Sequence, residues 1–477
     1  MNSELCFSTA TELACALAQG DLSAQEVVAA HLQQVERYND SVNAIVTLVP
    51  DRAMAAAREA DRTRARGHAL GPLHGLPIAH KDLSPTAGVR TTYGSTAFAE
   101  FVPTEDSLLV ERLRAAGAIM IGKTNTPEFG AGSQTYNDVF GATRNPYATD
   151  RTCGGSSGGA AVALATGMLP IADGSDLGGS LRNPASFCNV VGLRPTPGRV
   201  PTWPSAAPWS PLPVEGPMAR TVQDTALLLS AMAGPDPRSP IALSEPGEVF
   251  RAALERDFAG VPIALSSDFH QLFPVQAPIA ETVEATAAVF RQLGCRVERA
   301  LPDFSGADEV FKTLRAWLYA GMCGPLLTKH RDKFKDTLIW NIEAGLRLST
   351  EELRQAEGLH AALYHRVRSF MTEYQFLVLP VTQVVPFDID LPYVDEIEGE
   401  PMKTYLDWMR SCYYITATGH PAISVPCGFT GDGLPVGVQI VGRYRDDWGV
   451  LQLAYAFQEA TQVWKRRPPL CGPQDDQ

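Results

Sequence analysis

The chain has 477 residues, of which 45% are hydrophobic and 19% charged, so it holds enough apolar material for a large globular core. Its 40 basic and 53 acidic residues give a formal net charge of −13, so it lacks the positive footprint of a nucleic-acid-binding protein. Nine scattered cysteines without a Cys-x-x-Cys pair argue against a disulfide framework or a zinc site and favour reduced thiols in a cytoplasm.

The N-terminal 70 residues predict a helical layer. Residues 1–20 lack a basic segment followed by an apolar run, so we expect no signal peptide. No apolar run in the chain is long enough to cross a membrane, so we expect no membrane partner. Three Ser/Thr–Glu pairs have the capping-box spacing that marks a helix start: Thr9–Glu12, Ser23–Glu26 and Ser349–Glu352.

From residue 71 short apolar runs alternate with glycines and with helical periodicity. The pattern predicts strands at 75–81, 118–122, 261–265 and 295–298, and helices at 108–116, 279–293 and through 308–372. Near the end, Asp432-Gly433 separates two apolar runs, which predicts a hairpin. This alternation of strands and helices predicts an α/β fold of packed layers.

Residues 195–217 contain eight prolines and two tryptophans, so they must form extended, irregular chain. A linker between domains is one interpretation. We favour a loop beside the active site, because apolar, aromatic-bearing segments rarely remain solvated as linkers.

The densest chemical feature is Gly154-Gly155-Ser156-Ser157-Gly158-Gly159. Four glycines around two serines indicate a backbone that approaches another group closely or adopts positive φ. Such a loop ahead of a helix could cradle a phosphate, but the lysine of the Walker pattern is missing from its end. The alternative is that the glycines expose serine hydroxyls for chemistry.

A second glycine–serine cluster, at 174–182, favours that alternative. The backbone N–H groups of Leu177, Gly178, Gly179 and Ser180 can converge on one point, because the two glycines remove bulk. Such a nest is an oxyanion hole, and Ser180 ends it where a nucleophile would lie.

A nucleophilic serine needs a base. Lys81 follows the apolar run GLPIA, where burial would remove its proton and make its amine a base near neutral pH. The neighbouring His80 is the other candidate, although no motif marks a Ser/His/Asp arrangement.

Together these motifs resemble those of the amidase signature family. The resemblance rests on Lys81-Asp82, GGSSGG (154–159) and DLGGSLR (176–182). It extends to GKTNTPEFG (122–130), GATRNP (141–146), FCNVVGLRPTPGRV (187–200) and LPVGVQIVG (434–442), and it weakens between about 235 and 375. It implies an α/β fold with a large twisted mixed β-sheet that helices cover on both faces.

The resemblance also implies the roles of the site residues. Ser180 would be the nucleophile, Ser156 a bridging serine after a cis peptide bond, and Lys81 the terminal base. A hydroxyl both donates and accepts, so Ser156 can take the Ser180 proton while it gives its own to neutral Lys81. The residues expected to orient the site are Ser157, Asp176 and Arg182, the last two as a pair. No metal or organic cofactor is required.

The resemblance implies a single domain over 1–477. Its expected segments are a helical N-terminal layer (1–70), a catalytic core (71–235), a variable substrate-pocket region (236–410) and a C-terminal return to the sheet (411–477). Aromatic candidates for the pocket are Tyr136, Trp203, Trp209, Trp317 and Tyr319. We expect Cys153 and Cys188 to be packing residues, and the role of Glu128 is open.

Within the family, the residues favour a stand-alone hydrolase. The branch that transfers ammonia from glutamine in tRNA-dependent amidotransferases usually has Arg-Gln-Pro after its nucleophile and later Ser-Leu-Asp-Gln. This chain has Arg182-Asn183-Pro184 and LPVEGP (212–217) instead. The motifs at 122–200 most resemble those of bacterial acylamidases, 6-aminohexanoate-cyclic-dimer hydrolases and urethanases.

We therefore predict an amidase or carbamate hydrolase that acts on a small molecule, as a monomer or homodimer. The alternatives are a glutamine amidotransferase subunit of the same family and a non-catalytic α/β binding subunit.

Overall fold

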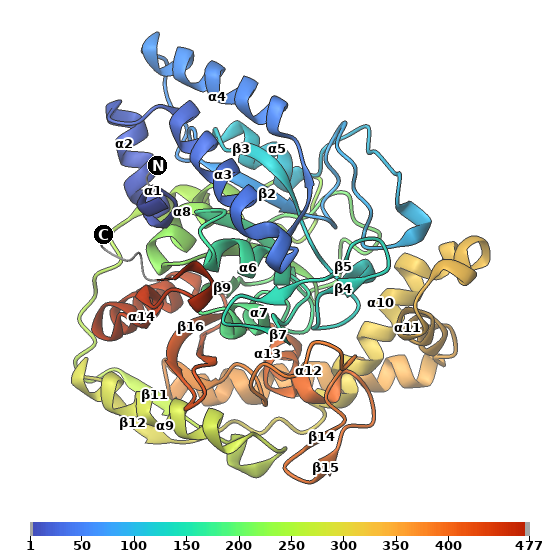
Figure 1. The fold of residues 1–477 in the computed structure, drawn as a ribbon. Helices are drawn as coiled ribbons and strands as arrows, with labels where there is room; N and C mark the ends of the chain where they lie inside the picture. Colours follow the sequence, from blue (N-terminus) through green and yellow to red (C-terminus); the bar gives the residue numbers. More distant parts are fainter. Residues whose placement is uncertain (1–2, 473–477) are drawn as a thin grey trace.

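The computed structural model describes residues 3–472 and is built around one large mixed sheet (Figure 1). Its eight strands lie in the order β12 (Arg296–Arg299), β11 (Pro262–Leu265), β13 (Phe376–Pro380), β17 (Pro435–Gly442), β16 (Ala422–Phe429), β9 (Val191–Arg194), β10 (Val214–Ala219) and β8 (Ile171–Asp176). The first three are parallel, and all other neighbours are antiparallel.

A smaller sheet carries the N-terminal strands. Its order is β1 (Ile45–Leu48), β3 (Ile119–Thr124) and β2 (Pro77–Lys81), with β2 parallel and β1 antiparallel to β3. Short ribbons pair β4 (Tyr136–Asn137) with β5 (Gly141–Ala142), β6 (Arg144–Asn145) with β7 (Ala148–Thr152), and β14 (Glu396–Ile397) with β15 (Glu400–Pro401).

Helices pack on both faces of the large sheet. In β17, Ser186 of α7 (Arg182–Phe187) approaches Gly437, and Val450 of α14 (Asp447–Thr461) approaches Gly442. Residues an odd number apart in a strand face opposite ways, so α7 and α14 cover opposite faces. The sheet and its two helix layers confirm the predicted fold class.

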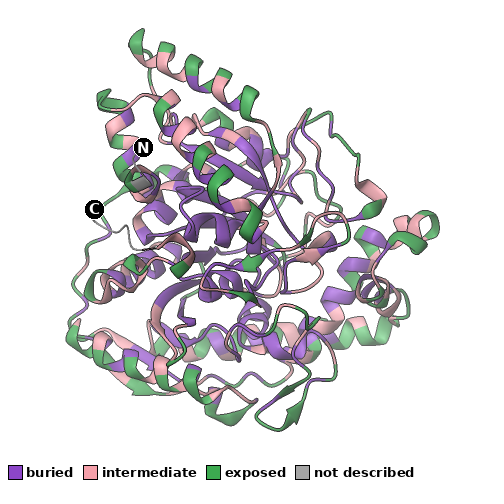
Figure 2. Ribbon diagram, viewed as in Figure 1, coloured by how far each residue is buried: buried purple, intermediate pink, exposed green. Residues whose placement is uncertain are grey.

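The other helices are α1 (Ser3–Phe7), α2 (Ala10–Gln19), α3 (Ala24–Val42), α4 (Pro50–Ala65), α5 (Leu108–Ala115), α6 (Gly158–Ala165), α8 (Val222–Met232), α9 (Ala277–Gln292), α10 (Ala307–His330), α11 (Asp336–Leu346), α12 (Thr350–Glu373) and α13 (Arg410–Thr418). Within residues 3–472, none of the helices is long and apolar enough to cross a membrane. One apolar core extends from Ala10 to Phe457, and Figure 2 shows its buried residues gathered in the central strands.

Most of the predicted elements are present. The three capping boxes start α2, α3 and α12, and the predicted strands appear as β2, β3, β11 and β12. The hairpin is formed by β16 and β17. The helical stretch 308–372 is divided into α10, α11 and α12.

Two segments differ from the expected layout. Strand β1 lies inside the 1–70 segment that we expected to be helical, because three of its four residues pair with β3 far along the chain. The 236–410 segment contributes β11, β12 and β13 to the large sheet, so the chain returns to that sheet before residue 411. The pairing of β1 with β3 joins distant segments, which a short apolar run does not reveal, whereas the strands at 261–265 and 295–298 were predicted from such runs.

The proline-rich segment is anchored at its start by a buried carboxylate. Asp447, the first residue of α14, accepts hydrogen bonds from Thr196 N (2.7 Å), Thr196 Oγ1 (2.8 Å) and Arg199 Nε (3.1 Å). Arg199 also pairs with Glu245, whose side chain is 53% exposed. One arginine therefore has a buried and an exposed carboxylate partner.

We expect Asp447→Ala to lower the free energy of unfolding by about 3–5 kcal/mol, because it leaves Arg199 buried without that partner. The control Glu245→Ala removes the exposed partner of the same arginine and should cost less than about 1 kcal/mol. Equilibrium urea denaturation measures both. Equal losses would show that Asp447 does not anchor the segment.

Candidate active site

Lys81 ends β2, all five residues of which are buried, and is itself 1% exposed. Its Nζ atom lies 2.7 Å from Ser156 Oγ, 2.9 Å from Ser157 Oγ and 3.1 Å from Ser175 Oγ. Three hydroxyl partners suit either an ammonium group with three N–H donors or a neutral amine with two donors and one lone pair, because a hydroxyl can both donate and accept. The structure thus brings together Lys81 and Ser156, which are far apart in the sequence.

The surroundings of the Lys81 amine favour its neutral form. Burial lowers the pKa of Lys81 to about 7, although the charges of Asp176 and Asp173 act in the opposite direction. Among residues 3–472, no carboxylate oxygen lies within 4 Å of the Nζ atom to hold the proton there. At neutral pH a large fraction of the Lys81 amine is therefore unprotonated and carries a free lone pair.

The first glycine–serine cluster packs tightly around Ser156. The Gly155–Ser156 peptide bond is cis, as the family resemblance implied. Ser133 Oγ donates to the Gly155 carbonyl (2.6 Å), and Thr135 Oγ1 donates to the Gly154 carbonyl (2.9 Å). The glycines serve close packing and the placement of serine hydroxyls, which agrees with the chemical interpretation of this loop.

The second cluster follows β8 and carries Ser180, which is 9% exposed. The Ser157 N–H donates to the Ser180 carbonyl (3.1 Å), so the 156–157 pair lies against the backbone of residue 180. Gly179 has φ +120°, and a Cβ there would lie 2.6 Å from Cys412 Cβ. Only glycine fits this turn.

One of the four N–H groups predicted to form an oxyanion hole is already engaged. The Gly179 N–H donates to Asp176 Oδ1 (2.9 Å). The amides of Leu177, Gly178 and Ser180 are therefore the remaining candidates. Gly179 instead shapes the loop, through its positive φ and its bond to Asp176.

Asp176 is the centre of a fully buried charge cluster. Arg182 donates to both carboxylate oxygens (3.0 Å each), which confirms the predicted pair, and Arg194 lies 3.3 Å away. Burial alone would raise the pKa of Asp176, but the two guanidinium groups hold it well below its usual range. Arg194, which ends β9 directly after the buried residues 190–193, was not identified from the sequence.

The cluster also attaches the nucleophile loop to the rest of the fold. Arg182 donates to Gln439 Oε1 in β17 (2.5 Å) and to Thr416 Oγ1 in α13 (2.9 Å). The segment after β8 is therefore held by elements from the C-terminal third of the chain.

His80 faces away from the serines. Its Nδ1 lies 2.7 Å from Asp173 Oδ1 in β8, and Asp173 Oδ2 accepts the Lys81 N–H (3.2 Å). The pair His80–Asp173 thus joins β2 to β8, and the geometry favours Lys81 over His80 as the base for Ser156.

A cavity of about 620 Å³ opens beside Ser175. Tyr93, Phe129 and Trp203 form its aromatic lining. Among the residues that the structure describes, Glu215 is the one charged residue that lines it. The lining includes residues from Gly198 to Glu215, which agrees with the expectation that the proline-rich segment lies beside the site. Tyr93 and Phe129 were missed because Tyr93 lies in a turn and Phe129 in a 3-10 helix of three residues, and neither has a periodic pattern.

Of the five aromatic residues predicted for the pocket, only Trp203 lines this cavity. Trp209 and Trp317 are 72% and 53% exposed. Tyr319 is buried, with its hydroxyl donating to the Phe129 carbonyl (3.3 Å), and the ring of Tyr136 faces Lys335 Nζ at 3.6 Å. Aromatic character alone did not identify the lining.

The remaining motif residues have packing roles. Cys153 and Cys188 are fully buried, and burial raises the pKa of the Cys153 thiol to about 12 and that of Cys188 well above its usual value. Glu128 accepts from Ser95 Oγ (2.6 Å) and from the Lys335 N–H (2.8 Å). Glu128 therefore ties the start of α11 to the loop at residue 95.

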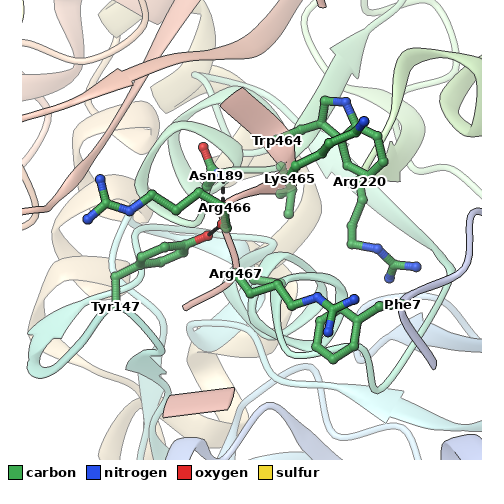
Figure 3. A pocket seen from close by; sticks show the side chains of 10 residues that line it. Phe7, Tyr147, Asn189, Arg220, Trp464, Lys465, Arg466 and Arg467 are labelled. Carbon is green, nitrogen blue, oxygen red and sulfur yellow. Dashed lines mark hydrogen bonds between the residues drawn. The ribbon is translucent and has the colours of Figure 1, made fainter. Parts of the chain in front are cut away.

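A second cavity, of about 270 Å³, lies under the C-terminal segment (Figure 3). Tyr147 donates to the Arg466 carbonyl (2.6 Å), and Asn189 donates to the carbonyls of Val463 and Arg466 (3.1 Å each). None of the predicted site residues lines it. These bonds attach the last described segment to the body of the fold.

The chain is similar to known proteins over almost its whole length. The Amidase family model matches residues 26–451. The chain is 35% identical to an acylamidase from Rhodococcus erythropolis over 471 residues, 97% of each chain. It is 36% identical to a subunit of the glutamyl-tRNA(Gln) amidotransferase from Moorella thermoacetica over 491 residues, 98% of this chain and 99% of that one.

Among solved structures, a bacterial aryl acylamidase of the amidase signature enzymes superposes with a TM-score of 0.91 at 29% identity, covering 98% of this chain and 99% of that one. This chain therefore belongs to the amidase signature family, as an amidohydrolase that acts on carbon–nitrogen bonds other than peptide bonds.

Proposed function

We propose that this protein is a stand-alone hydrolase of aryl or acyl amides or carbamates, with Ser180 as nucleophile and Ser156 and Lys81 as its proton relay. The observation that carries the proposal is the buried Lys81 amine 2.7 Å from Ser156 Oγ, in a loop whose next residue is hydrogen-bonded to Ser180.

In the proposed reaction, Ser180 Oγ attacks the carbonyl carbon and gives its proton to Ser156 Oγ. Ser156 passes its own proton to the neutral Lys81 amine. When the tetrahedral intermediate collapses, the relay runs backwards and protonates the leaving nitrogen, and Ser180 keeps the acyl group. A water molecule then attacks the acyl-enzyme with the same relay as base and releases the acid.

The negative oxygen of the intermediate needs donors that are already in place. We assign this role to the amides of Leu177, Gly178 and Ser180, which follow the end of β8. The buried cluster of Asp176, Arg182 and Arg194 supports it by fixing the loop. The loss of one such donor costs about 2.7–4 kcal/mol in other hydrolases.

The residues that line the cavity favour a stand-alone hydrolase rather than an amidotransferase component. Glutamine presents an α-carboxylate, which proteins usually bind with arginine or lysine. Within residues 3–472, neither residue type lines the cavity, whose lining is apolar, aromatic and hydroxyl-bearing with Glu215 as its charged residue. An aryl or alkyl group fits this lining, as the names of the acylamidase relative and the aryl acylamidase neighbour also suggest for their own substrates.

The amidotransferase component is the second candidate, because relatives with that name match the chain equally well. Turnover of an anilide, an aryl carbamate, an aliphatic amide, an ester and glutamine separates the two. We expect the anilide or the carbamate to exceed glutamine in kcat/KM. Preference for glutamine would support the amidotransferase alternative, and no turnover of any substrate would support the non-catalytic one.

Lys81→Met should lower kcat/KM by about 10²–10⁴-fold, because it removes the terminal proton acceptor while filling most of the same volume. Lys123 is the matched control. It is equally buried, but its amine donates to Ser84 O (2.5 Å) and Thr86 Oγ1 (3.0 Å).

Lys123→Met should lower the melting temperature yet keep kcat/KM within about tenfold, since it removes no proton-transfer group. Similar losses of activity in both variants would mean that burial of the amine, and not its base function, is what activity requires.

The pH profile should follow the state of Lys81. The relay needs the unprotonated amine, and burial lowers the pKa of Lys81 to about 7. For a substrate that does not titrate, kcat/KM should rise as the pH rises through about 7 and fall about tenfold per unit below it. An inflection near 4 would instead indicate a carboxylate base, and one near 10 an ordinary lysine.

A further inference from the structure

Glu215 lies on the same side of the large sheet as the Lys81 amine. In the antiparallel pair of β10 and β8, Glu215 is directly opposite Ser175. Residues directly opposite each other point to the same face of a sheet. Ser175 Oγ lies 3.1 Å from Lys81 Nζ, so the Glu215 carboxyl is one strand away from the relay.

The Glu215 carboxyl lines the 620 Å³ cavity and has an unsatisfied oxygen atom. Its Oε2 atom is buried and has no hydrogen-bond partner in the described part of the chain. Burial, together with the charge of Asp173, raises the pKa of Glu215 to about 8. A buried carboxylate without a donor is unfavourable, so a ligand that supplies one is stabilised there.

The rest of the lining limits what that ligand can be. Apart from Glu215, the lining is apolar, aromatic or hydroxyl-bearing, with Trp203, Phe129 and Met322 among its larger members. This combination suits a hydrocarbon group that carries one N–H donor at its far end. A hydrocarbon group without a donor would leave the carboxyl unpaired.

We infer that Glu215 is a specificity-determining residue that binds a distal amino group of the substrate, separated from the scissile bond by an alkyl or aryl spacer. The inference rests on the proposed hydrolase function and defines its substrate class more narrowly. The ion pair forms between the Glu215 carboxylate and the substrate ammonium, inside the cavity and apart from the proton relay.

The test compares isosteric substrates that differ by one charge. On the acyl side the pair is 5-aminopentanoyl anilide and hexanoyl anilide. On the amine side it is the acetamides of 4-(aminomethyl)aniline and 4-ethylaniline. All four are assayed at pH 9, where both the Glu215 carboxylate and the alkylammonium group are ionised.

In one of the two pairs, the wild type should hydrolyse the ammonium substrate with a higher kcat/KM than the neutral substrate. Glu215→Gln should reduce that preference at least about tenfold, because it removes the carboxylate that pairs with the ammonium group, while the neutral member is still turned over. Glu215→Asp should restore part of the preference. The control Glu245→Gln removes a surface carboxylate outside the cavity and should keep the wild-type ratio.

An unchanged ratio in both pairs on Glu215→Gln would overturn the inference. Failure of the proposed hydrolase function would look different, because no member of either pair would then be turned over. If Glu215→Gln does not fold, inhibition of the wild type decides the matter. Hexylamine should inhibit anilide hydrolysis more strongly than hexanol, and equal inhibition would contradict the role of Glu215.

Discussion

The contact between the buried Lys81 amine and three serine hydroxyls is the constraint on which the rest of the site depends. An ammonium group in this position would lose several kcal/mol of hydration, and among the described residues no carboxylate contacts it to offset that loss. The neutral amine is therefore favoured, with a lone pair directed among hydroxyls. In the proposed mechanism this lone pair is the base. Its basicity depends on the buried position of Lys81 at the end of β2.

Two buried carboxylates of β8, Asp173 and Asp176, keep this contact in place. Asp173 joins β8 to β2 through His80 and the Lys81 amide, which fixes where the lysine emerges. Asp176, at the end of the same strand, binds Arg182 and Arg194 and fixes where the Ser180 loop begins. β8 therefore aligns the lysine with the two serine loops, and its register with β10 also sets the position of Glu215.

Local features of the structure could be predicted from the sequence, and long-range ones could not. Capping boxes, the β16–β17 hairpin and the pairing of Asp176 with Arg182 depend on residues a few positions apart. The approach of Lys81 to Ser156 depends on the pairing of distant segments, and only the family resemblance indicated it. Arg194, Glu215 and the Tyr93–Phe129 lining have no local signal, because their neighbours in space are distant in the chain.

The most direct test of this account is the titration of the Lys81 amine itself. Heteronuclear NMR of protein labelled at its lysine side chains, with Lys81→Met to assign the resonance, reports the protonation of Nζ as the pH changes. The account predicts a midpoint near 7, in line with the effect of burial on its pKa. A midpoint close to that of an exposed lysine, about 10.4, would contradict it.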